Sequence, residues 1–580
     1  MSPINIDWSA ILPLNGSRAE GFEELCAQLA RFESPVGSRF ERNGPPDAGV
    51  ECFAALSDGS EWGWQAKYFE SLGDSQWSQL DESVKTALEK HPRLARYFVC
   101  APGDLPDARM EGRKSARERW NDHVQKWSGW ASARSMAVDF VYWGSHELLD
   151  RLSLPQHVGR VRFWFDARAF DGAWFKARLD EAIKTAGPRY TPEIHVDLPI
   201  AKEFEAFGRT EWFFDEVKAH ARSLRKKLES VRYSDPENPD AALDTSLSAL
   251  SAGVRTVLTD LGTLTVQPTG VLPLRQIVEH VTSAESSADE LERLLRDRER
   301  ADDAEHPPAG GDIAGSSHRD RLRRCRAYLW ELSADLRLAR EHLDHWEHVA
   351  NRSLMILKGA AGTGKTHLLC DVARQRVKAS RPTVLLMGQR FVSLEPPWTQ
   401  VMQQLDLDGL SAEEFVGALE AAAQAADSRA LVLIDAMNEG AGRLLWPNHL
   451  AAFLAHLARS LWIGLVLVTR SSYEEILIPQ EIRASAVTVT HEGFADHEYD
   501  ATRTFFVYYG LELPSTPLLE PEFRNPLFLK TLCLGLNAKG ERRLPRGFHG
   551  VTAVFSLYLE AINGRLASLL DFNPKHGLVG

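Results

Sequence analysis

The stretch SLMILKGAAGTGKTHLLCDVARQRV (Ser353–Val377) decides the fold of the carboxy-terminal half of the chain. Its first five residues form a short apolar run typical of a buried strand, and the residues after Thr366 have the pattern of an amphipathic helix. Between them lies GAAGTGKT (Gly359–Thr366), a complete GxxxxGK[ST] motif. A strand, a glycine-rich loop and a helix in this order predict a nucleotide-binding α/β domain with a parallel sheet.

The residue types of this loop suit a chain of phosphates. Glycines let successive backbone N–H groups turn toward the phosphates, and the helix N-terminus adds a partial positive charge. We expect the Lys365 amine to bridge the β- and γ-phosphates and the Thr366 hydroxyl to bind Mg²⁺. The alternative interpretation is an ordinary glycine-rich turn. The residues expected to contact the nucleotide are Gly359, Gly362, Thr363, Gly364, Lys365 and Thr366.

Two later apolar runs supply acidic and cationic groups. The run ALVLI (Ala430–Ile434) ends in Asp435, and a carboxylate at the end of a neighbouring strand can bind Mg²⁺. Glu439, four residues further on, can polarise the attacking water. A third run, LVLVT, is followed by Arg470, for which we expect either a contact with the γ-phosphate or a surface ion pair.

The segments GAAGTGKT, LVLIDAMNEG, LVLVTRSSY and FRNPLFLKTLC together resemble the STAND branch of P-loop NTPases, the class that includes NACHT-type immune receptors. The resemblance covers about residues 336–570. It implies that Asp435 binds Mg²⁺ and that Glu439 activates water. It also implies that Pro526 packs against the adenine, because NPL (Asn525–Leu527) matches the proline motif of that class.

A second chemical signal lies near the amino terminus, in residues 43–69. Two apolar runs flank a tight turn, Ser57–Ser60, which predicts a β-hairpin. Glu51 lies on the first run, while Gln65 and Lys67 on the second are two residues apart and face the same side. A carboxylate can hold Mg²⁺ and a lysine can orient or deprotonate water, so this hairpin predicts phosphodiester hydrolysis.

The same hairpin resembles the PD-(D/E)xK nuclease superfamily, in particular Mrr-like members with a QxK motif. The resemblance implies a restriction-endonuclease-like α/β domain that cuts double-stranded DNA. A glutamate of the preceding helical stripe GFEELCAQLARF, Glu23 or Glu24, is expected near the metal. The alternatives are a nuclease fold used only for binding and a hairpin with a merely solvated lysine. The catalytic residues implied are Asp47, Glu51, Gln65 and Lys67, and the metal ligands expected are Glu23, Asp47, Glu51 and Gln65, with Thr366 and Asp435 at the nucleotide.

Changes of pattern divide the chain into five segments of a multidomain α/β protein. The connecting region is expected to be a helical spacer or self-association surface, and within it GPRYTPEIHVDLP (Gly187–Pro199) is expected as a structured linker and strand. An arginine-rich run at 319–326 is expected as a helix-docking face. The segments are a nuclease-like domain (1–152), a mixed and helical connecting region (153–301), a Pro/Gly-rich linker (302–317), the NTPase domain (318–510) and a following helical domain (511–580).

Composition limits the classes of function. The 580 residues include 67 basic and 80 acidic side chains, giving a net charge of −13, so DNA contact is expected to be local or switched. The 44% hydrophobic content excludes global disorder. Six cysteines without a CxxC pair suit a reducing compartment. No signal-peptide pattern opens the chain and no apolar run spans a bilayer, so we expect a cytoplasmic protein without membrane contact.

A nuclease-like domain followed by a STAND NTPase resembles the antiviral STAND (Avs) proteins of bacteria. The resemblance implies ATP and Mg²⁺ as cofactors, a viral protein as trigger, self-association into an oligomer, and degradation of double-stranded DNA. It also implies a carboxy-terminal sensor, which these 580 residues do not include, so we expect the chain to be a fragment. The alternatives are an ATP-driven, restriction-type DNA motor and a STAND scaffold with an inactive nuclease-like domain.

Overall fold

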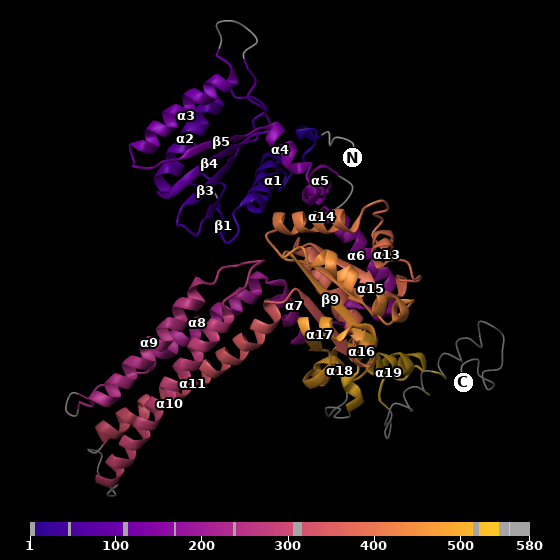
Figure 1. Ribbon diagram of the computed structural model, residues 1–580. Coiled ribbons are helices and arrows are strands. Elements are labelled where there is room, and N and C mark those ends of the chain that lie inside the picture. Colours follow the sequence, from indigo (N-terminus) through magenta and orange to yellow (C-terminus); the bar gives the residue numbers. More distant parts are fainter. Residues whose placement is uncertain are drawn as a thin grey trace, which may run out of the picture.

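The computed structural model shows a multidomain α/β protein with two five-stranded sheets (Figure 1). Within its described part, no helix combines the length and apolarity needed to cross a membrane. The structure describes residues 6–44, 48–107, 114–166, 170–235, 239–305, 316–513 and 521–544, with two isolated positions, 556 and 559.

The amino-terminal domain is built on a mixed sheet of order β1-β2-β3-β4-β5. The first three strands are antiparallel neighbours, whereas β4 and β5 continue parallel to β3. The predicted hairpin is confirmed, because β2 pairs with β3 across the expected turn. The strands are β1 (Arg39–Arg42), β2 (Cys52–Ala55), β3 (Glu61–Ala66), β4 (Leu94–Cys100) and β5 (Asp139–Trp143).

Helices cover both faces of this sheet. Alternate side chains of β4 point to opposite faces, so Phe98 packs with one helix, α1, while Tyr97 packs with the pair α2 and α3. The tryptophans of the domain, including Trp64 and Trp127, lie in these two cores, which agrees with packing rather than base stacking. The helices are α1 (Arg18–Glu33), α2 (Asp74–Lys90) and α3 (Ala116–Ser132).

The second sheet is parallel throughout and has the order β10-β6-β9-β8-β7. This confirms the predicted parallel α/β domain. Because β9 lies between β6 and β8, the ends of all three strands meet at one edge of the sheet. The strands are β6 (Leu354–Gly359), β7 (Thr383–Met387), β8 (Ala430–Asp435), β9 (Ile463–Arg470) and β10 (Val487–Thr490).

The helices of this domain form two layers around the sheet. α12, which follows the glycine-rich loop, contributes to the core on one face, while α13, α14 and α15 cover the other. The edge strand β7 is covered by α6, which also packs against α12. The bounds are α6 (Gly172–Ala186), α12 (Lys365–Lys378), α13 (Pro397–Gln404), α14 (Ala412–Ala425) and α15 (Gly442–Leu457).

The structure divides the chain differently from the expected segments. α5 (Val158–Phe165) and α6 fall in the expected connecting region, 153–301, yet they pack on α14 and on β7 and α12 of the carboxy-terminal α/β domain. Their aromatic side chains explain this placement, since Trp174 and Phe175 complete the apolar core of that domain. α11 (Ser316–Ala350) lies in the expected NTPase segment, 318–510, but belongs to a helix bundle.

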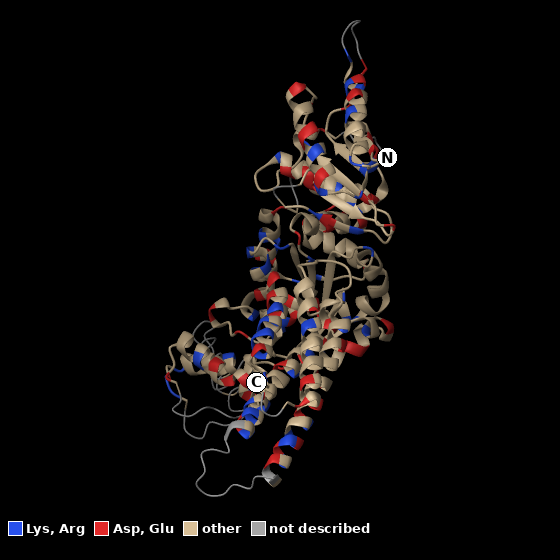
Figure 2. Ribbon diagram, turned by 90° about the vertical axis from the view of Figure 1, so that its left-hand side faces the viewer, with Lys and Arg blue, Asp and Glu red and all other residues tan. Residues whose placement is uncertain are grey.

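This bundle consists of four long helices that project from the carboxy-terminal α/β domain (Figure 1). Acidic and basic residues are interspersed along its helices (Figure 2). Three arginines of the arginine-rich run pair with acids of the same bundle, Arg319 with Asp302, Arg321 with Asp235 and Arg326 with Glu299, as expected for a helix-docking face. The helices are α8 (Glu211–Ser230), α9 (Ala241–Thr263), α10 (Leu274–Glu305) and α11.

Two expected boundaries also shift. α10 runs to Glu305 and α11 begins at Ser316, so the described part of the expected linker 302–317 is helical at both ends, and residues 306–315 lie outside the described residues. The boundary at 510/511 crosses one small apolar cluster, to which three carboxy-terminal elements contribute together with Ile194. Most of the expected domain beyond Leu544 lies outside the described residues. The three elements are α18 (Glu498–Tyr509), η9 (Pro521–Arg524) and α19 (Pro526–Ala538).

The two α/β domains are joined where α5 crosses α14. A glycine on each helix, Gly159 and Gly417, removes the side chain from the crossing point, and a Cβ built on Gly159 would lie 2.4 Å from backbone atoms of Gly417 and Ala418. α5 also contacts the amino-terminal domain, because the Trp164 carbonyl accepts a hydrogen bond from the Leu12 N–H at 2.8 Å. α5 therefore lies between the two domains.

We expect Gly159→Ala to destabilise the protein by about 2 kcal/mol, because backbone atoms of α14 cannot rotate away from the added methyl group. Chemical denaturation followed by circular dichroism measures the change. Gly129→Ala is the matched control, since Gly129 lies exposed inside α3 with nothing within 4 Å of an added Cβ, and it should be neutral or stabilising. Equal behaviour of the two variants would contradict the close crossing.

Candidate functional site

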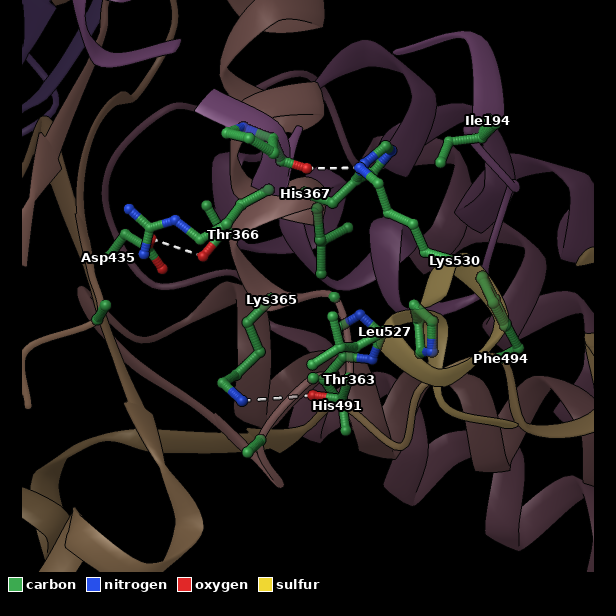
Figure 3. A pocket seen from close by; sticks show the side chains of 18 of the residues that line it. Ile194, Thr363, Lys365, Thr366, His367, Asp435, His491, Phe494, Leu527 and Lys530 are labelled. Carbon is green, nitrogen blue, oxygen red and sulfur yellow. Dashed lines mark hydrogen bonds between the residues drawn. The ribbon is translucent and has the colours of Figure 1, made fainter. Parts of the chain in front are cut away.

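A cavity of about 560 Å³ opens at the edge where β6, β8 and β9 end (Figure 3). The glycine-rich loop and the first turn of α12 form one wall, and the ends of β8 and β9 form another. The segment Pro188–Leu198 and the first turns of α19 complete it. Elements that are far apart in sequence thus enclose one site.

Lys365 is held against its own loop. Its Nζ donates hydrogen bonds to the carbonyl oxygens of Gly359 at 2.8 Å and Ala360 at 2.7 Å, and lies 3.3 Å from Thr363 Oγ1. Burial, against the opposing charge of Asp435 and aided by the Arg470 guanidinium, lowers the pKa of Lys365 to about 8. A phosphate would give this amine anionic oxygens in place of neutral carbonyls.

The two expected nucleotide-side Mg²⁺ ligands lie in direct contact. The Thr366 hydroxyl donates a hydrogen bond to Asp435 Oδ2 at 2.8 Å, and Asp435 is only 1% exposed. Burial raises the pKa of Asp435 to about 6. A hydroxyl and a carboxylate are hard oxygen ligands that fit Mg²⁺, which retains most of its waters. Among the described residues, no group of three or more His, Cys, Asp and Glu side chains could hold a metal by itself.

Glu439 lines the same cavity but is engaged by an arginine. Arg189 Nη1 lies 3.0 Å from Glu439 Oε2 and 3.3 Å from Oε1. Arg470, at the end of β9, also lines the cavity, and within the described ranges it forms no ion pair. Its backbone N–H donates to Asn438 Oδ1 at 3.4 Å. The placement agrees with the cavity alternative for Arg470 rather than with a surface ion pair.

The first turn of α19 docks onto the glycine-rich loop. Asn525 Nδ2 donates to the Ala361 carbonyl at 3.1 Å, while Asn525 Oδ1 caps α19 by accepting from the Leu527 N–H at 2.9 Å. The Leu527 N–H also donates to the Gly362 carbonyl at 3.2 Å. The contact requires glycine in the loop, because Gly362 has φ +77° and an added Cβ would lie 2.8 Å from Asn525 Oδ1.

Pro526 lies against the same loop, where an added Cβ on Gly364 would be 3.3 Å from Pro526 Cγ. The wall beyond it is apolar. This apolar end and the charged end around Lys365 give the cavity the two halves that a nucleotide needs. The apolar lining comprises Ile194, Val196, Leu198, Phe494, Phe505, Pro526, Leu527 and Leu534.

The segment 187–199, expected as a linker and strand, instead forms two 3-10 turns, η3 (Gly187–Arg189) and η4 (Pro192–Ile194). Each turn has proline near its start, and proline cannot donate to a sheet ladder. The segment is fastened to α19, because Lys530 Nζ donates to the Thr191 hydroxyl at 3.0 Å and to the Pro188 carbonyl. The proline and arginine content of this segment predicts a rigid turn, but it does not predict which residues the turn contacts.

The sequence motifs do not indicate the histidines that line the cavity. His367 stacks on His195 with ring centroids 5.5 Å apart, and burial lowers its pKa to about 4. His491 follows β10, and burial lowers its pKa to about 4 as well. All three line the cavity. Near-neutral solution therefore leaves His367 and His491 uncharged, so Lys365 and the arginines supply the positive charge.

A second constellation lies in the amino-terminal domain. Gln65 Nε2 donates a hydrogen bond to Glu51 Oε1 at 2.8 Å, and Lys67 Nζ lies 3.5 Å from the same oxygen. Glu51 directly precedes β2, Gln65 belongs to β3, and Lys67 directly follows β3. The hairpin thus brings three of the expected catalytic residues together.

The remaining expected metal ligands have different placements. Asp47 lies outside the described residues. Glu23 lies half-buried on α1. Burial of the neighbouring Cys26 thiol, the nearby Cys100 and the charge of Glu23 together raise the pKa of that thiol. Glu24 is buried and pairs with Arg42 of β1, which lies opposite Cys52 at the start of β2, so this carboxylate is engaged by an arginine beside the hairpin.

Comparisons with known proteins give little beyond this geometry. No family model matches the chain, and no curated protein matches it. A solved structure of PCH-2 from C. elegans is 14% identical, with a TM-score of 0.21, over 37% of this chain and 61% of that one. The matched part thus spans less than two thirds of PCH-2, and so loose a superposition carries no argument.

We expect Asp435→Asn to stabilise the ligand-free protein at pH 8 by about 3 kcal/mol, because the folded state raises the pKa of this carboxyl from 3.8 to about 6. The protonated folded form is the favoured one, so stability is lost as the pH rises from about 4 to 6. Thermal or urea unfolding at pH 4 and pH 8 measures this. A gain of equal size at both pH values would contradict a strained buried carboxylate.

Proposed function

We propose that the chain is an ATP-dependent switch that controls an Mg²⁺-dependent endonuclease in its amino-terminal domain. The observation that carries the proposal is the convergence of Lys365, Thr366 and Asp435 on one cavity with a polar and an apolar end. The contact among Glu51, Gln65 and Lys67 supports the nuclease half.

In the NTPase domain, Lys365 would bind the phosphate chain and the apolar wall beside Pro526 would take the adenine ring. Thr366 and Asp435 would hold Mg²⁺, which neutralises charge on the phosphates. Glu439 would accept a proton from water once its carboxylate is free of Arg189. The glycine loop excludes side chains from the phosphate path.

In the amino-terminal domain, Glu51 would hold Mg²⁺, with Glu23 and Asp47 as the further acids of the set. The ion supplies a water of lowered pKa and neutralises charge on a phosphodiester. Lys67 lies beside Glu51, where its ammonium can orient that water and stabilise the pentavalent transition state. Gln65 fixes the rotamer of Glu51 through its hydrogen bond.

A continuous set of contacts links the two halves. Gln28 on α1 donates to the Ala421 carbonyl of α14 at 3.1 Å and accepts from Trp164 Nε1 of α5 at 3.2 Å. Arg31, also on α1, lies over the ring of Trp462 at 4.6 Å. Trp462 directly precedes β9, the strand that ends in the cavity. These contacts support transmission between the cavity and α1, the helix that carries Glu23.

We extend the proposal to antiviral defence on the resemblance to antiviral STAND proteins. In this account a viral protein promotes assembly of ATP-bound protomers, and the clustered nuclease domains degrade double-stranded DNA. The net charge of −13 supports a protomer with little attraction for DNA by itself. Assembly would raise the effective concentration of nuclease domains on the same DNA.

We expect Lys67→Ala to lower cleavage of linear double-stranded DNA in Mg²⁺ and ATP by about a hundredfold or more, since it removes the cation beside Glu51. ATP affinity should stay unchanged. Lys90→Ala, at an exposed position at the end of α2, is the matched control and should cut normally. Cleavage by Lys67→Ala at the wild-type rate, or no cleavage by the wild-type protein at any concentration, would overturn the nuclease assignment.

We expect Lys365→Ala to abolish binding of ATP, measured by calorimetry, and to abolish ATP-dependent cleavage with it. Lys378→Ala removes an exposed lysine at the other end of the same helix and should bind ATP normally. ATP-independent cleavage that is unaffected by Lys365→Ala would leave a nuclease without the proposed switch.

A further inference from the structure

Arg189 and Glu439 form an ion pair across the nucleotide cavity. Arg189 belongs to η3, outside the NTPase sheet in sequence, whereas Glu439 follows the end of β8. Arg189 Nη1 contacts both carboxylate oxygens, at 3.0 and 3.3 Å, Nη2 donates to Gln389 Oε1, and Nε donates to the Ala186 carbonyl at 3.3 Å. Both residues line the cavity.

The pair is open to the cavity rather than sealed in the core. The side chains of Arg189 and Glu439 are 32% and 30% exposed. Replacing one partner of this ion pair by another ion therefore costs less free energy than in a fully buried pair, where the charge left unpaired would have no contact with solvent. A planar guanidinium binds phosphate as readily as carboxylate. An anion that enters the cavity can thus compete with Glu439 for Arg189.

Arg189 lines the same cavity as Lys365 and Asp435. Its charge helps to lower the pKa of Asp435, while the charge of Glu439 raises it, so both lie within electrostatic reach of that carboxylate. At the glycine-rich loop, the charge of Asp435 raises the pKa of Lys365 and that of Arg470 lowers it. The cationic groups therefore approach Asp435 from two sides, Lys365 from the loop and Arg189 from η3.

We propose that Arg189 is a specificity-determining residue that distinguishes a nucleoside triphosphate from a diphosphate. In the ligand-free chain it holds Glu439, and in the triphosphate complex it exchanges that carboxylate for the terminal phosphate. Glu439 is then released to accept a proton from water. This inference rests on the proposed nucleotide site and specifies how that site reads the nucleotide.

The exchange has a route to the rest of the chain. η3 directly follows α6, which packs on β7 and α12, and Lys530 fastens the segment after η3 to α19. A change of partner at Arg189 therefore acts next to α6, whose Trp174 and Phe175 share an apolar core with α14, the helix on which α5 packs. α5 is the helix that lies between the two α/β domains.

A double-variant cycle tests the exchange by binding alone. The affinities of ADP and of the non-hydrolysable β,γ-imido analogue of ATP are measured by calorimetry for wild type, Arg189→Gln, Glu439→Gln and the double variant. We expect Arg189→Gln to lower the affinity for the triphosphate analogue about tenfold, as for one lost charge-assisted hydrogen bond. The affinity for ADP should fall less than about twofold. In the wild-type background, Glu439→Gln should raise the affinity for the analogue about tenfold, because it frees Arg189. In the Arg189→Gln background, the same substitution should raise that affinity at most about twofold.

Arg374→Gln serves as the structural control. Arg374 donates to the Tyr190 hydroxyl at 3.2 Å and so holds the same segment, but it does not line the cavity. We expect it to affect ADP and the analogue equally.

Three results would overturn the inference. The effects of Arg189→Gln and Glu439→Gln could multiply in the double variant, Arg189→Gln could weaken ADP and the analogue to the same extent, or it could weaken neither. Normal wild-type binding of both nucleotides alongside any of these results would leave the proposed nucleotide site standing. Failure of wild type to bind either nucleotide would instead remove the site and the inference together.

Discussion

Backbone contact between Gly159 on α5 and Gly417 on α14 fixes how the two α/β domains meet. Any side chain at the crossing would separate the helices, and with them the surfaces on which Gln28 and Arg31 reach the NTPase domain. The position of the hairpin acid Glu51 relative to the nucleotide cavity thus depends on this contact between two glycine backbones. Ion pairs around the crossing, such as Arg160 with Glu420, add orientation.

The cavity itself is held in an electrostatically unfavourable state. Burial raises the pKa of Asp435 and lowers that of Lys365, which means that the folded chain disfavours the charged form of both groups. In the ligand-free chain, Arg189 and Glu439 form an ion pair with each other. An anionic ligand with its divalent cation would supply opposite charges to Lys365, Arg189 and Asp435. A site of this kind is suited to a switch, since ligand binding changes the partners of several elements at once.

The elements that the sequence predicts well are those encoded in one contiguous stretch. The glycine loop, Asp435 at the end of its strand and the Glu51–Lys67 hairpin each depend on local periodicity and turn residues. Arg189 could not be predicted, because its role depends on packing across 250 positions of sequence. The placement of α5 and α6 likewise depends on which apolar surface they meet, here that of α14 and β7, and local pattern does not carry this information.

The central claim is that nucleotide occupancy in the carboxy-terminal half is felt in the amino-terminal domain. Hydrogen–deuterium exchange of the full chain, with and without a saturating non-hydrolysable ATP analogue, tests it most directly. The account expects altered exchange in α5 and in α1 (Arg18–Glu33), as well as in the cavity, and no such change in Lys365→Ala. Altered exchange confined to residues 354–544, with α1 and α5 unchanged at full occupancy, would contradict it.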